Sequence, residues 1–390
     1  MTAERIAPLE MLRRLVAFDT TSSKSNLALI EAVRDYLAGH GVAARLVPNA
    51  DGTKANLFAT IGPEGDGGVV LSGHTDVVPV DGQDWASDPF AMVERDGKAF
   101  GRGTTDMKGF IATALALVPD MVAARPRTPL HFAFSYDEEV GCLGVRPLLA
   151  LLARELPNPH LAIIGEPTEM KVASAHKGVY SFQTTVVGRE AHSSASHLGV
   201  SAIAAAARIV DHIYGLADAL AATGARHADF DPPHTTLNVG RIDGGTARNI
   251  IARHCRFAWE IRPVPGDDAE TIKSGVEAFI DGTVLPEMRK RFPGASIVTE
   301  IGARVPPLVP EEGSPAEALV LALTGQNRAG AVSFASEAGL FQEQGIPAVL
   351  CGPGSVRQAH QPDEFVEIAQ IAACEAFLRK LIAWAAKAGE

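Results

Sequence analysis

Two histidines and several carboxylates of this chain each follow a short apolar, strand-like stretch of sequence. In open α/β sheets, functional groups collect at the carboxyl ends of strands, so we expect these side chains to meet. Imidazoles and carboxylates are common ligands of divalent metal ions. The five segments are 71–76 with His74 and Asp76, 101–106 with Asp106, 136–139 with Glu138 and Glu139, 163–167 with Glu166, and 358–360 with His360.

Together these segments are typical of a two-metal hydrolytic centre. Two divalent ions polarise an acyl oxygen and generate hydroxide near neutral pH, and a carboxylate that binds no metal then acts as base. The adjacent Glu138 and Glu139 fit this division, because neighbouring residues at a strand end point in different directions. Each segment alone has an ordinary alternative: a solvated glutamate pair, a hydrogen-bonded structural histidine, or, for Asp106, a helix N-cap. Their joint occurrence favours the metal centre.

Length and composition narrow the class of protein. The chain has 390 residues, which exceeds the size at which a single core stops growing and favours two domains. It is 46% hydrophobic and 21% charged, as in an ordinary soluble globular protein. Its net charge of −11 argues against nucleic acid or an anionic membrane as the main partner, and is typical of a soluble protein.

The cysteines and the amino-terminal segment predict a cytoplasmic protein. The four cysteines lie far apart and form no CxxC pair, so neither a disulfide framework nor a zinc knuckle is indicated. Residues 1–14 are charged and helix-like, without the apolar core of a secretion signal. No apolar run reaches the roughly 18 residues of a membrane span. Cys351 lies near the predicted centre, but we interpret it as a small buried residue.

Strand-like and helix-like stretches alternate up to residue 176, which predicts an α/β domain with a parallel or mixed sheet. Apolar residues at helical spacing mark the helices, and Gly41 is a plausible end of the second one. The predicted helices are 5–18, 25–40, 107–121 and 144–156, and the predicted strands are 44–48, 56–61, 68–72, 129–135 and 160–164.

The pattern changes after Lys177 to the order strand, helix, strand, strand, helix, strand, typical of a half-solvated antiparallel sheet. We therefore predict an inserted domain at 177–301 within a catalytic domain formed by 1–176 and 302–390. The predicted elements of the insertion are strands 179–188, 236–242, 251–261 and 295–301 and helices 199–214 and 268–285. Those that follow are helices 315–323, with Ser314 as N-cap, 336–344 and 365–386, and strand 348–351.

Six strings resemble motifs of the dinuclear zinc aminoacylase and deacylase family over almost the whole chain. The family's fold implies a mixed-sheet, zinc-peptidase-like catalytic domain with an inserted α+β, ferredoxin-like domain that serves as lid and dimerisation surface. The strings are SGHTDVVP at 72–79, Trp85 with DPF at 88–90, GRGTTDMKG at 101–109, DEE at 137–139, GEPT at 165–168 and QAHQPDE at 358–364.

The resemblance implies a role for each residue of the predicted centre. Glu138 would be the general base and acid, and Asp76 would orient the imidazole of His74. The resemblance also implies two divalent ions, zinc with cobalt as an alternative, and a cis peptide bond after the bridging aspartate. The implied metal ligands are His74 and Glu166 for one ion, Glu139 and His360 for the other, and Asp106 as the bridge between them.

The inserted domain carries a motif of its own, GREAHSS at 188–194. In the family this histidine stabilises the oxyanion on the partner subunit's substrate, which implies that His192 acts in a homodimer. Without the resemblance, His192 is equally typical of a strand-end surface histidine. The chain departs from the family at Ala252 and at 195–197, where proline is common, and these departures affect the shape of the lid loops.

Other strings imply which residues contact the substrate. GGTARN at 244–249 and EIRP at 260–263 imply that Asn249 and Arg262 bind a substrate carboxylate, for which a bidentate arginine is well suited. Gly354 and Ser355 would bind the α-carboxylate through a backbone N–H and a hydroxyl. Glu337 stands where desuccinylases carry a cationic string, so it would suit a substrate ammonium; its alternative role is a helix-start carboxylate stabilised by the helix dipole.

Within the family, the local strings are most similar to the acetylornithine deacetylase branch. They are HKG at 176–178, EIRPVPG at 260–266, SFASEA at 333–338 and GPGS at 352–355. The expected reaction is hydrolysis of N-acetyl-L-ornithine to L-ornithine and acetate in arginine biosynthesis. The alternatives are a succinyl-diaminopimelate desuccinylase or another deacylase or aminopeptidase of the family, a relative that has lost catalysis, and a metal-free sugar- or nucleotide-binding protein.

Overall fold

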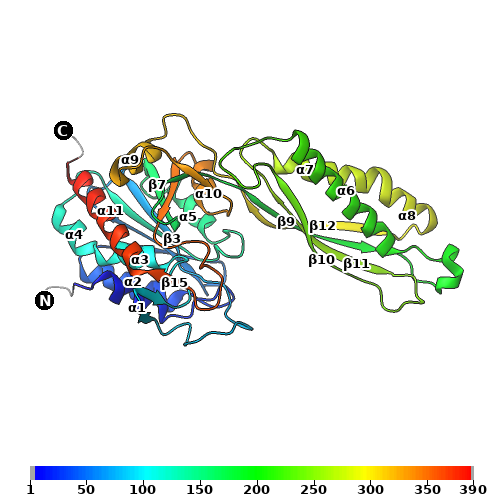
Figure 1. Cartoon of the computed structure of the whole chain (residues 1–390), viewed down its shortest axis with the longest axis horizontal. Helices are drawn as coiled ribbons and strands as arrows, with labels where there is room; N and C mark the ends of the chain where they lie inside the picture. Colours follow the sequence, from blue (N-terminus) through cyan, green and yellow to red (C-terminus); the bar gives the residue numbers. More distant parts are fainter. Residues whose placement is uncertain (1–4, 388–390) are drawn as a thin grey trace. The chain divides into compact units, whose positions relative to one another are not determined.

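The computed structural model describes residues 5–387, which form two compact units (Figure 1). The first unit contains the described residues up to Ala175, Pro310–Val332 and those from Ser336 onward, and the second contains His176–Val309 and Ser333–Ala335. The second unit extends beyond the predicted residue 301, because its last strand continues to Val305. Within residues 5–387, no helix is long and apolar enough to cross a membrane.

A mixed sheet forms the centre of the first unit, as predicted. It has eight strands. The strands are β1 (Ala44–Pro48), β2 (Ala55–Ile61), β3 (Val69–His74), β6 (Leu130–Ser135), β7 (Leu161–Pro167), β8 (Ala173–His176), β13 (Gly330–Val332) and β14 (Ala348–Gly352). Their order is β1-β2-β6-β3-β7-β14-β8-β13. The central pairs β6/β3, β3/β7 and β7/β14 are parallel, so the carboxyl ends of β3, β6 and β7 meet at one edge.

Helices cover this sheet, and a small three-stranded sheet extends the unit. The helices are α1 (Pro8–Val16), α2 (Leu27–Gly39), α3 (Lys108–Ala116), α4 (Val118–Ala124), α5 (Val145–Leu152), α9 (Pro315–Thr324), α10 (Ala338–Glu343) and α11 (Ile368–Lys387). The small sheet has the order β15-β5-β4 and consists of β4 (Val93–Arg95), β5 (Lys98–Phe100) and β15 (Phe365–Glu367).

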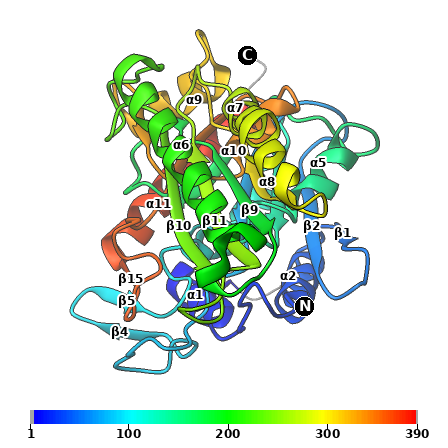
Figure 2. The same cartoon turned by 90° about the vertical axis from the view of Figure 1, so that its right-hand side faces the viewer.

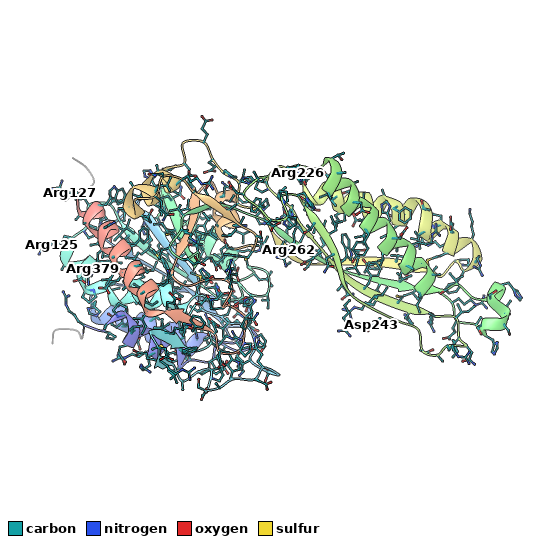
Figure 3. All side chains as sticks on the ribbon, in the orientation of Figure 1. Arg125, Arg127, Arg226, Asp243, Arg262 and Arg379 are labelled. Atoms are coloured by element: carbon teal, nitrogen blue, oxygen red, sulfur yellow. The ribbon has the colours of Figure 1, made fainter. Side chains whose placement is uncertain are left out.

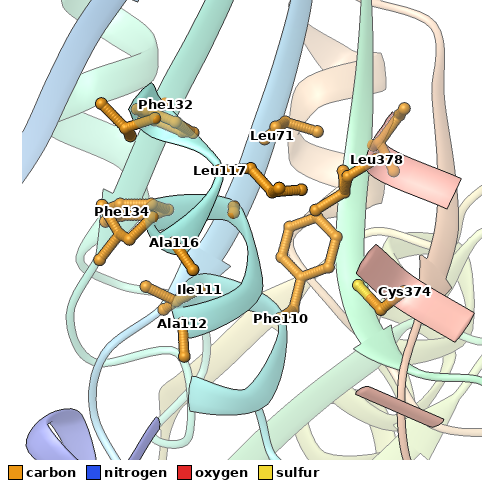
Figure 4. Packing of buried hydrophobic residues seen from close by; sticks show 14 of the residues in the cluster. Leu71, Phe110, Ile111, Ala112, Ala116, Leu117, Phe132, Phe134, Cys374 and Leu378 are labelled. Carbon is orange, nitrogen blue, oxygen red and sulfur yellow. The ribbon is translucent and has the colours of Figure 1, made fainter. Parts of the chain in front are cut away.

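Alternate residues of the strands pack on the two faces of the large sheet. On one face, Leu71 of β3 and Phe132 of β6 join Phe110 of α3 and Leu378 of α11 in a continuous buried cluster (Figure 4). Gly165 of β7 makes room for this packing, because a Cβ atom there would lie 2.0 Å from the Phe110 ring. The residues between these, such as the buried Ser72, point to the opposite face, where α5 and α10 contact the sheet.

The second unit has the predicted strand–helix–strand–strand–helix–strand order. Its elements are β9 (Val179–Val187), a 3₁₀ turn (Ser193–Leu198), α6 (Ala202–Thr223), β10 (Thr236–Gly244), β11 (His254–Arg262), α7 (Ala269–Phe279), a π-helical turn (Ile280–Val284), α8 (Leu285–Arg291) and β12 (Ser296–Val305). The antiparallel order β10-β11-β9-β12 is ferredoxin-like. The helices cover one face of this sheet (Figure 2).

Several predicted boundaries differ from the structure for local reasons. The helix predicted at 107–121 is divided into α3 and α4, because Pro119 occupies the first turn of a new helix. The last helix begins at Ile368 instead of Phe365, since Phe365–Glu367 pairs with β5. The helix predicted at 268–285 passes into a π-helical turn at Ile280. The short strands β4, β5, β8 and β13 were not predicted, because three or four residues show no clear period.

Candidate metal centre

His74 ends β3 with its ring fixed at both nitrogens. Nδ1 lies 2.9 Å from the backbone oxygen of Asp76, and Nε2 lies 3.0 Å from Oδ1 of Asp106. The side chain is 1% exposed. An Nδ1–H that donates to a carbonyl leaves Nε2 as the metal-binding atom, which is the usual arrangement of a ligating histidine.

Asp106 lies between the two histidines of the predicted centre. Its Oδ1 faces His74, and its Oδ2 lies 3.3 Å from Nε2 of His360. A carboxylate whose two oxygens face two different ligands has the geometry of a bridge between two ions. The alternative role as a helix cap is not what the structure has, because Met107 precedes α3 and no side chain caps it. The peptide bond between Asp106 and Met107 is cis.

Glu139 and His360 complete the other side of this cluster. Oε2 of Glu139 lies 3.1 Å from Nε2 of His360. Glu139 follows β6, whose end is next to that of β3 in the sheet. Ligand atoms of His74, Asp106 and Glu139 all lie within 4.8 Å of one another, so the three are close enough to take part in one metal centre.

Glu166 near the end of β7 is the carboxylate whose surroundings best fit a metal ligand. The residue is 4% exposed, and its Oε1 is buried without a hydrogen-bond partner among the described residues. Leaving a buried carboxylate oxygen unpaired is costly unless a metal ion binds it. The donor set of this centre, imidazole and carboxylate, fits zinc and similar divalent ions.

Several buried groups at the centre have pKa values that are shifted upward. Burial raises the pKa of Glu138 and Glu166 well above the usual range, and neighbouring carboxylates raise it further. Burial also raises the pKa of Glu139 to about 7. Burial lowers the pKa of His74, but its bonds to Asp106 and Asp76 outweigh this, and the net shift is upward. Burial is the largest cause of the three glutamate shifts, and repulsion between the carboxylates adds to it. Divalent cations at the centre would compensate both effects.

Asp76 contacts His74 and also holds the neighbouring glutamates. Its backbone oxygen is the closer partner of His74, and its carboxylate Oδ1 lies 3.6 Å from that ring. The carboxylate also accepts hydrogen bonds from Ser22 Oγ at 2.6 Å and from the backbone N–H groups of Glu138 at 3.1 Å and Glu139 at 3.3 Å. Asp76 therefore holds the backbone of the glutamate pair.

Glu364 is a buried residue to which the sequence analysis assigned no role. Its carboxylate accepts backbone N–H groups of Gly103 at 3.0 Å, Thr105 at 2.9 Å and Asp106 at 3.1 Å, and pairs with Arg102 at 2.7 Å. It thus fixes the loop that carries Asp106. The one sequence signal was its place in the QAHQPDE string, four residues after His360.

Arg102 extends this support to the His360 loop. The guanidinium, 1% exposed, donates to Gln83 Oε1 at 2.6 Å and lies 5.0 Å from the centre of the Trp85 ring. Gln83 in turn donates to the backbone oxygen of His360 at 3.0 Å. Three strings that are far apart in the sequence therefore meet around the loops that carry the bridging aspartate and His360.

In the second unit, His192 and Asn249 come from neighbouring loops. The backbone N–H of Ser193 donates to the backbone oxygen of Asn249 at 3.0 Å, and His192 forms a β-bridge with Ile250. His192 is exposed, and its Nδ1 lies 2.7 Å from Ser194 Oγ. The ring is thus oriented at Nδ1, with Nε2 available to a substrate.

Arg262 ends β11 in the same unit (Figure 3). Its Nη2 lies 3.0 Å from Glu260 Oε2, and the side chain is 35% exposed. A half-buried ion pair near the surface contributes little to stability, so the pair does not by itself hold Arg262 in place.

Glu337 is the predicted contact that the structure places least accessibly. It is 1% exposed, its Oε1 accepts a hydrogen bond from Ser135 Oγ at 2.5 Å, and its Oε2 accepts one from Ser72 Oγ at 3.4 Å. Burial raises its pKa to about 7. A substrate ammonium would have to displace these serines to reach the carboxylate.

Gly354 and Ser355 lie on a loop of the first unit that follows β14. Gly354 has a φ of 89°, and its carbonyl accepts the N–H of Glu169 at 2.7 Å. Ser355 Oγ donates to Glu169 Oε1 at 2.9 Å. Together with Glu169, the two residues line a cavity of about 250 Å³.

The chain has close relatives in sequence. An acetylornithine deacetylase of Proteus mirabilis (strain HI4320) is 35% identical over 382 residues, which cover 96% of this chain and 95% of the relative. An acetylornithine deacetylase of Salmonella heidelberg (strain SL476) is 35% identical over 370 residues, which cover 92% of each chain.

Solved structures share the fold. An M20 family metallo-carboxypeptidase from Sulfolobus solfataricus matches with a TM-score of 0.76 and 17% identity, covering 98% of this chain and 99% of its own. A dinuclear metal-binding M20 peptidase of Bacillus subtilis matches with a TM-score of 0.66 and 16% identity, covering 96% of both. The model of peptidase family M20/M25/M40 matches residues 70–384. With the metal-binding geometry described above, the chain belongs to this family of metal-dependent hydrolases.

Proposed function

We propose that this chain is a cytoplasmic deacetylase that hydrolyses N-acetyl-L-ornithine to L-ornithine and acetate in arginine biosynthesis. The observation that supports this most is the 35% identity to an acetylornithine deacetylase over nearly the full length of both chains. The small-molecule substrate agrees with a net charge of −11, which disfavours polyanionic partners.

The cofactors of this proposal are two divalent ions, zinc or alternatively cobalt. His74 and Glu166 would hold one, Glu139 and His360 the other, and Asp106 both. When bound, such ions polarise the scissile carbonyl and lower the pKa of water. The unpaired Oε1 of Glu166 and the surplus of negative charge support the assignment.

Glu138 is the proposed general base and acid. It takes a proton from the attacking water and passes it to the leaving amine nitrogen, so its carboxylate must exchange protons near neutral pH. Burial already raises its pKa, and the backbone bond to Asp76 fixes its position beside Glu139. Glu139 shares both features, so the assignment of Glu138 as base and Glu139 as ligand is supported by the contact of Glu139 with His360, a second proposed ligand.

His192 is the proposed stabiliser of the oxyanion, acting on the substrate of a second subunit. Its ring is exposed and oriented by Ser194, as a donor to an external group requires. This role makes a homodimer necessary, and sedimentation or light scattering of the purified protein tests for one.

Five residues are the proposed substrate contacts. Arg262 and Asn249 of the second unit suit a carboxylate, because both offer N–H donors. Gly354 and Ser355 would contact the α-carboxylate through a backbone N–H and a hydroxyl. Glu337 would attract the ornithine ammonium, either directly after displacing Ser72 and Ser135 or from beneath them through its charge.

A panel of substrates tests the proposal. Purified protein loaded with zinc or cobalt is given acetylornithine, succinyl-diaminopimelate, acetylmethionine and formylated amino acids, and the released amine is measured. The highest kcat/KM is expected for acetylornithine. Slow hydrolysis of acetylornithine beside fast hydrolysis of another substrate would replace the assignment, and full activity in a chelator would contradict the metal dependence.

The alternative is hydrolysis of another N-acyl amino acid or peptide, including succinyl-diaminopimelate, by the same centre. It is favoured by one observation: both oxygens of Glu337 already accept serine hydroxyls, so no freely accessible anion is assigned to the ornithine ammonium. Replacing Glu337 by glutamine separates the two, because only acetylornithine hydrolysis should show a marked rise in KM.

A further inference from the structure

A buried thiol lies against the carboxylate of Glu138. The Sγ atom of Cys142 is 3.3 Å from Glu138 Oε1, and the cysteine is 2% exposed. Since Glu138 is the proposed base, this contact involves the group that would exchange protons with the substrate. Cys142 lies outside the strings that resemble family motifs, and the sequence analysis gave it no role.

A tight turn brings the thiol to this position. The carbonyl oxygen of Glu138 accepts N–H groups from Gly141 at 2.9 Å and from Cys142 at 2.8 Å, so the chain folds back on the glutamate. Cys142 has a φ of 53°, in the left-handed region that residues other than glycine adopt only uncommonly. The turn keeps a side chain at a position where glycine would be easier to accommodate.

The thiol remains protonated and therefore able to donate. Burial raises the pKa of Cys142 well above its usual range, and the negative charge of Glu138 raises it further. The contact of 3.3 Å has Sγ–H as the donor and Oε1 as the acceptor. A thiol is a weak donor, and its hydrogen bond is strongest when the carboxylate is ionised, which is the form that accepts a proton from water.

The two ends of Glu138 are thus held by different groups. Asp76 accepts its backbone N–H at 3.1 Å, which fixes the Cα atom, while Cys142 contacts the carboxylate itself. Without a contact at the carboxylate, the side-chain torsions of glutamate would remain free to rotate it. A base that must face a water molecule depends on that orientation.

We propose that Cys142 is a positioning residue for Glu138: its thiol binds Oε1 and orients the carboxylate, so that Oε2 is the oxygen that exchanges the proton. This inference rests on the proposed role of Glu138 as base. It predicts an effect on the chemical step and little effect on substrate binding or metal content.

The test compares Cys142→Ala, Cys142→Gly and Cys142→Ser with the wild type and with Cys374→Ala, which removes a buried thiol far from Glu138 in the main core. Loss of the thiol should lower kcat about tenfold in the alanine and glycine variants, with KM within about twofold. Serine keeps a donor and should retain most of kcat. Metal content, measured by elemental analysis, should stay at the wild-type value in all of them.

The variants distinguish the thiol from the backbone. Glycine suits the positive φ at this position, so a full recovery of kcat in Cys142→Gly would attribute the effect to backbone strain and overturn the proposal. Wild-type kcat in Cys142→Ala, or a loss of metal in that variant, would overturn it as well. If Cys142→Ala does not fold, the glycine and serine variants still give the comparison.

An infrared readout is independent of activity. The S–H stretching band of Cys142, assigned by its loss in Cys142→Ser, should move to higher frequency in Glu138→Gln, because the amide is a weaker acceptor than a carboxylate. An unchanged band would show that the thiol does not donate to Glu138. If instead Glu138→Gln keeps wild-type turnover, the proposed base is wrong and the function proposal is at fault.

Discussion

The metal centre and the predicted substrate contacts of the second unit differ in how firmly the chain holds them. His74 and Glu166 are 1% and 4% exposed, and buried hydrogen bonds fix the loop of Asp106. In the second unit, His192 and Asn249 are exposed, and Arg262 has a surface ion pair as its partner. His360, whose side chain is 53% exposed, is the exception among the proposed ligands. The others are held inside the first unit, whereas the predicted contacts of the second unit lie at its surface.

This difference suggests a division of labour. A preorganised centre can act on any amide that reaches it, because its polar groups need not rearrange during the reaction. Exposed and lightly paired side chains can adapt to different substrates at little cost. Variants should therefore separate by the group that they remove: loss of the base or a ligand in the first unit, or of His192 in the second, should lower kcat, whereas loss of Arg262 or Asn249 should mainly raise KM.

The largest expected effect is that of Glu138→Gln, which removes the proposed base without changing size. We expect kcat to fall by about 10³-fold, because general acid–base catalysis typically contributes 10²–10⁴-fold. Metal content should be unchanged, as measured by elemental analysis. Glu64→Gln, which changes an exposed glutamate, is the matched control. Turnover within tenfold of wild type, with both metals bound, would contradict the assignment of the base.

His192→Ala should have the next largest effect, and it tests the second unit. Removing one donor to an oxyanion typically lowers kcat by about 10²–10³-fold. Metal content should be unaffected. If His192 acts across a dimer, mixing this variant with Glu138→Gln under conditions of subunit exchange should restore part of the activity, since each variant supplies what the other lacks. No recovery in mixed dimers that have been shown to form would indicate that His192 acts elsewhere.

Glu364→Gln should lower metal affinity without replacing a proposed metal ligand. The glutamine amide can accept fewer of the backbone N–H groups of Gly103, Thr105 and Asp106, and it loses the charge that pairs with Arg102. We expect metal affinity to fall by about 10–100-fold, as is usual when a group that supports a ligand is changed. Competition with a chelator measures this. Equal affinity in variant and wild type would mean that the loop holds its shape alone.

The elements of the fold differ in how well the sequence predicted them. Strands that are continuous apolar runs, such as β3, β6 and β7, were predicted to within a few residues of their bounds. Short strands were missed, and Phe365–Glu367 was placed in a helix because its pairing with β5 is a long-range contact. Ser314 was predicted as an N-cap and accepts the N–H of Glu317 at 3.5 Å. Apolar runs and capping residues therefore predicted an element correctly where no long-range strand pairing changed the local structure.

Within the site, the sequence revealed groups at strand ends but not the bonds that orient them. His74, Glu139 and Glu166 lie at or just after the ends of β3, β6 and β7, as strand order suggests, whereas Asp106 and His360 lie in loops outside the large sheet. That Asp76 would use its backbone for His74 and its carboxylate for the glutamate pair depends on φ and ψ, to which residue type gives no guide. Glu364 and Cys142 were passed over although each lies four residues from a predicted site residue, because only the folded chain shows that Glu364 binds the Asp106 loop and that Cys142 contacts the Glu138 carboxylate.

The smallest expected effect concerns Glu337 and the stability of the metal-free protein. Burial raises its pKa from 4.5 to about 7. Below pH 4.5 the group is protonated in both the folded and the unfolded chain. Between pH 4.5 and 7 the unfolded chain releases this proton while the folded chain keeps it, so stability falls as pH rises, by at most about 1.4 kcal/mol for each pH unit. Above pH 7 this loss is complete.

Glu337→Gln should reduce this slope, because the amide cannot ionise yet its oxygen can still accept the hydroxyl of Ser135. The measurement is urea unfolding of metal-free wild type and variant between pH 5 and pH 8, and the variant should lose less stability over that range. Glu138, Glu139 and Glu166, whose pKa values burial also raises, remain in both proteins and supply the slope that persists. Parallel curves would mean that Glu337 ionises without penalty, and that its charge already has a favourable partner. The two units would then differ less in how firmly they hold their functional side chains, because the first unit would stabilise the charge of Glu337 without a metal ion.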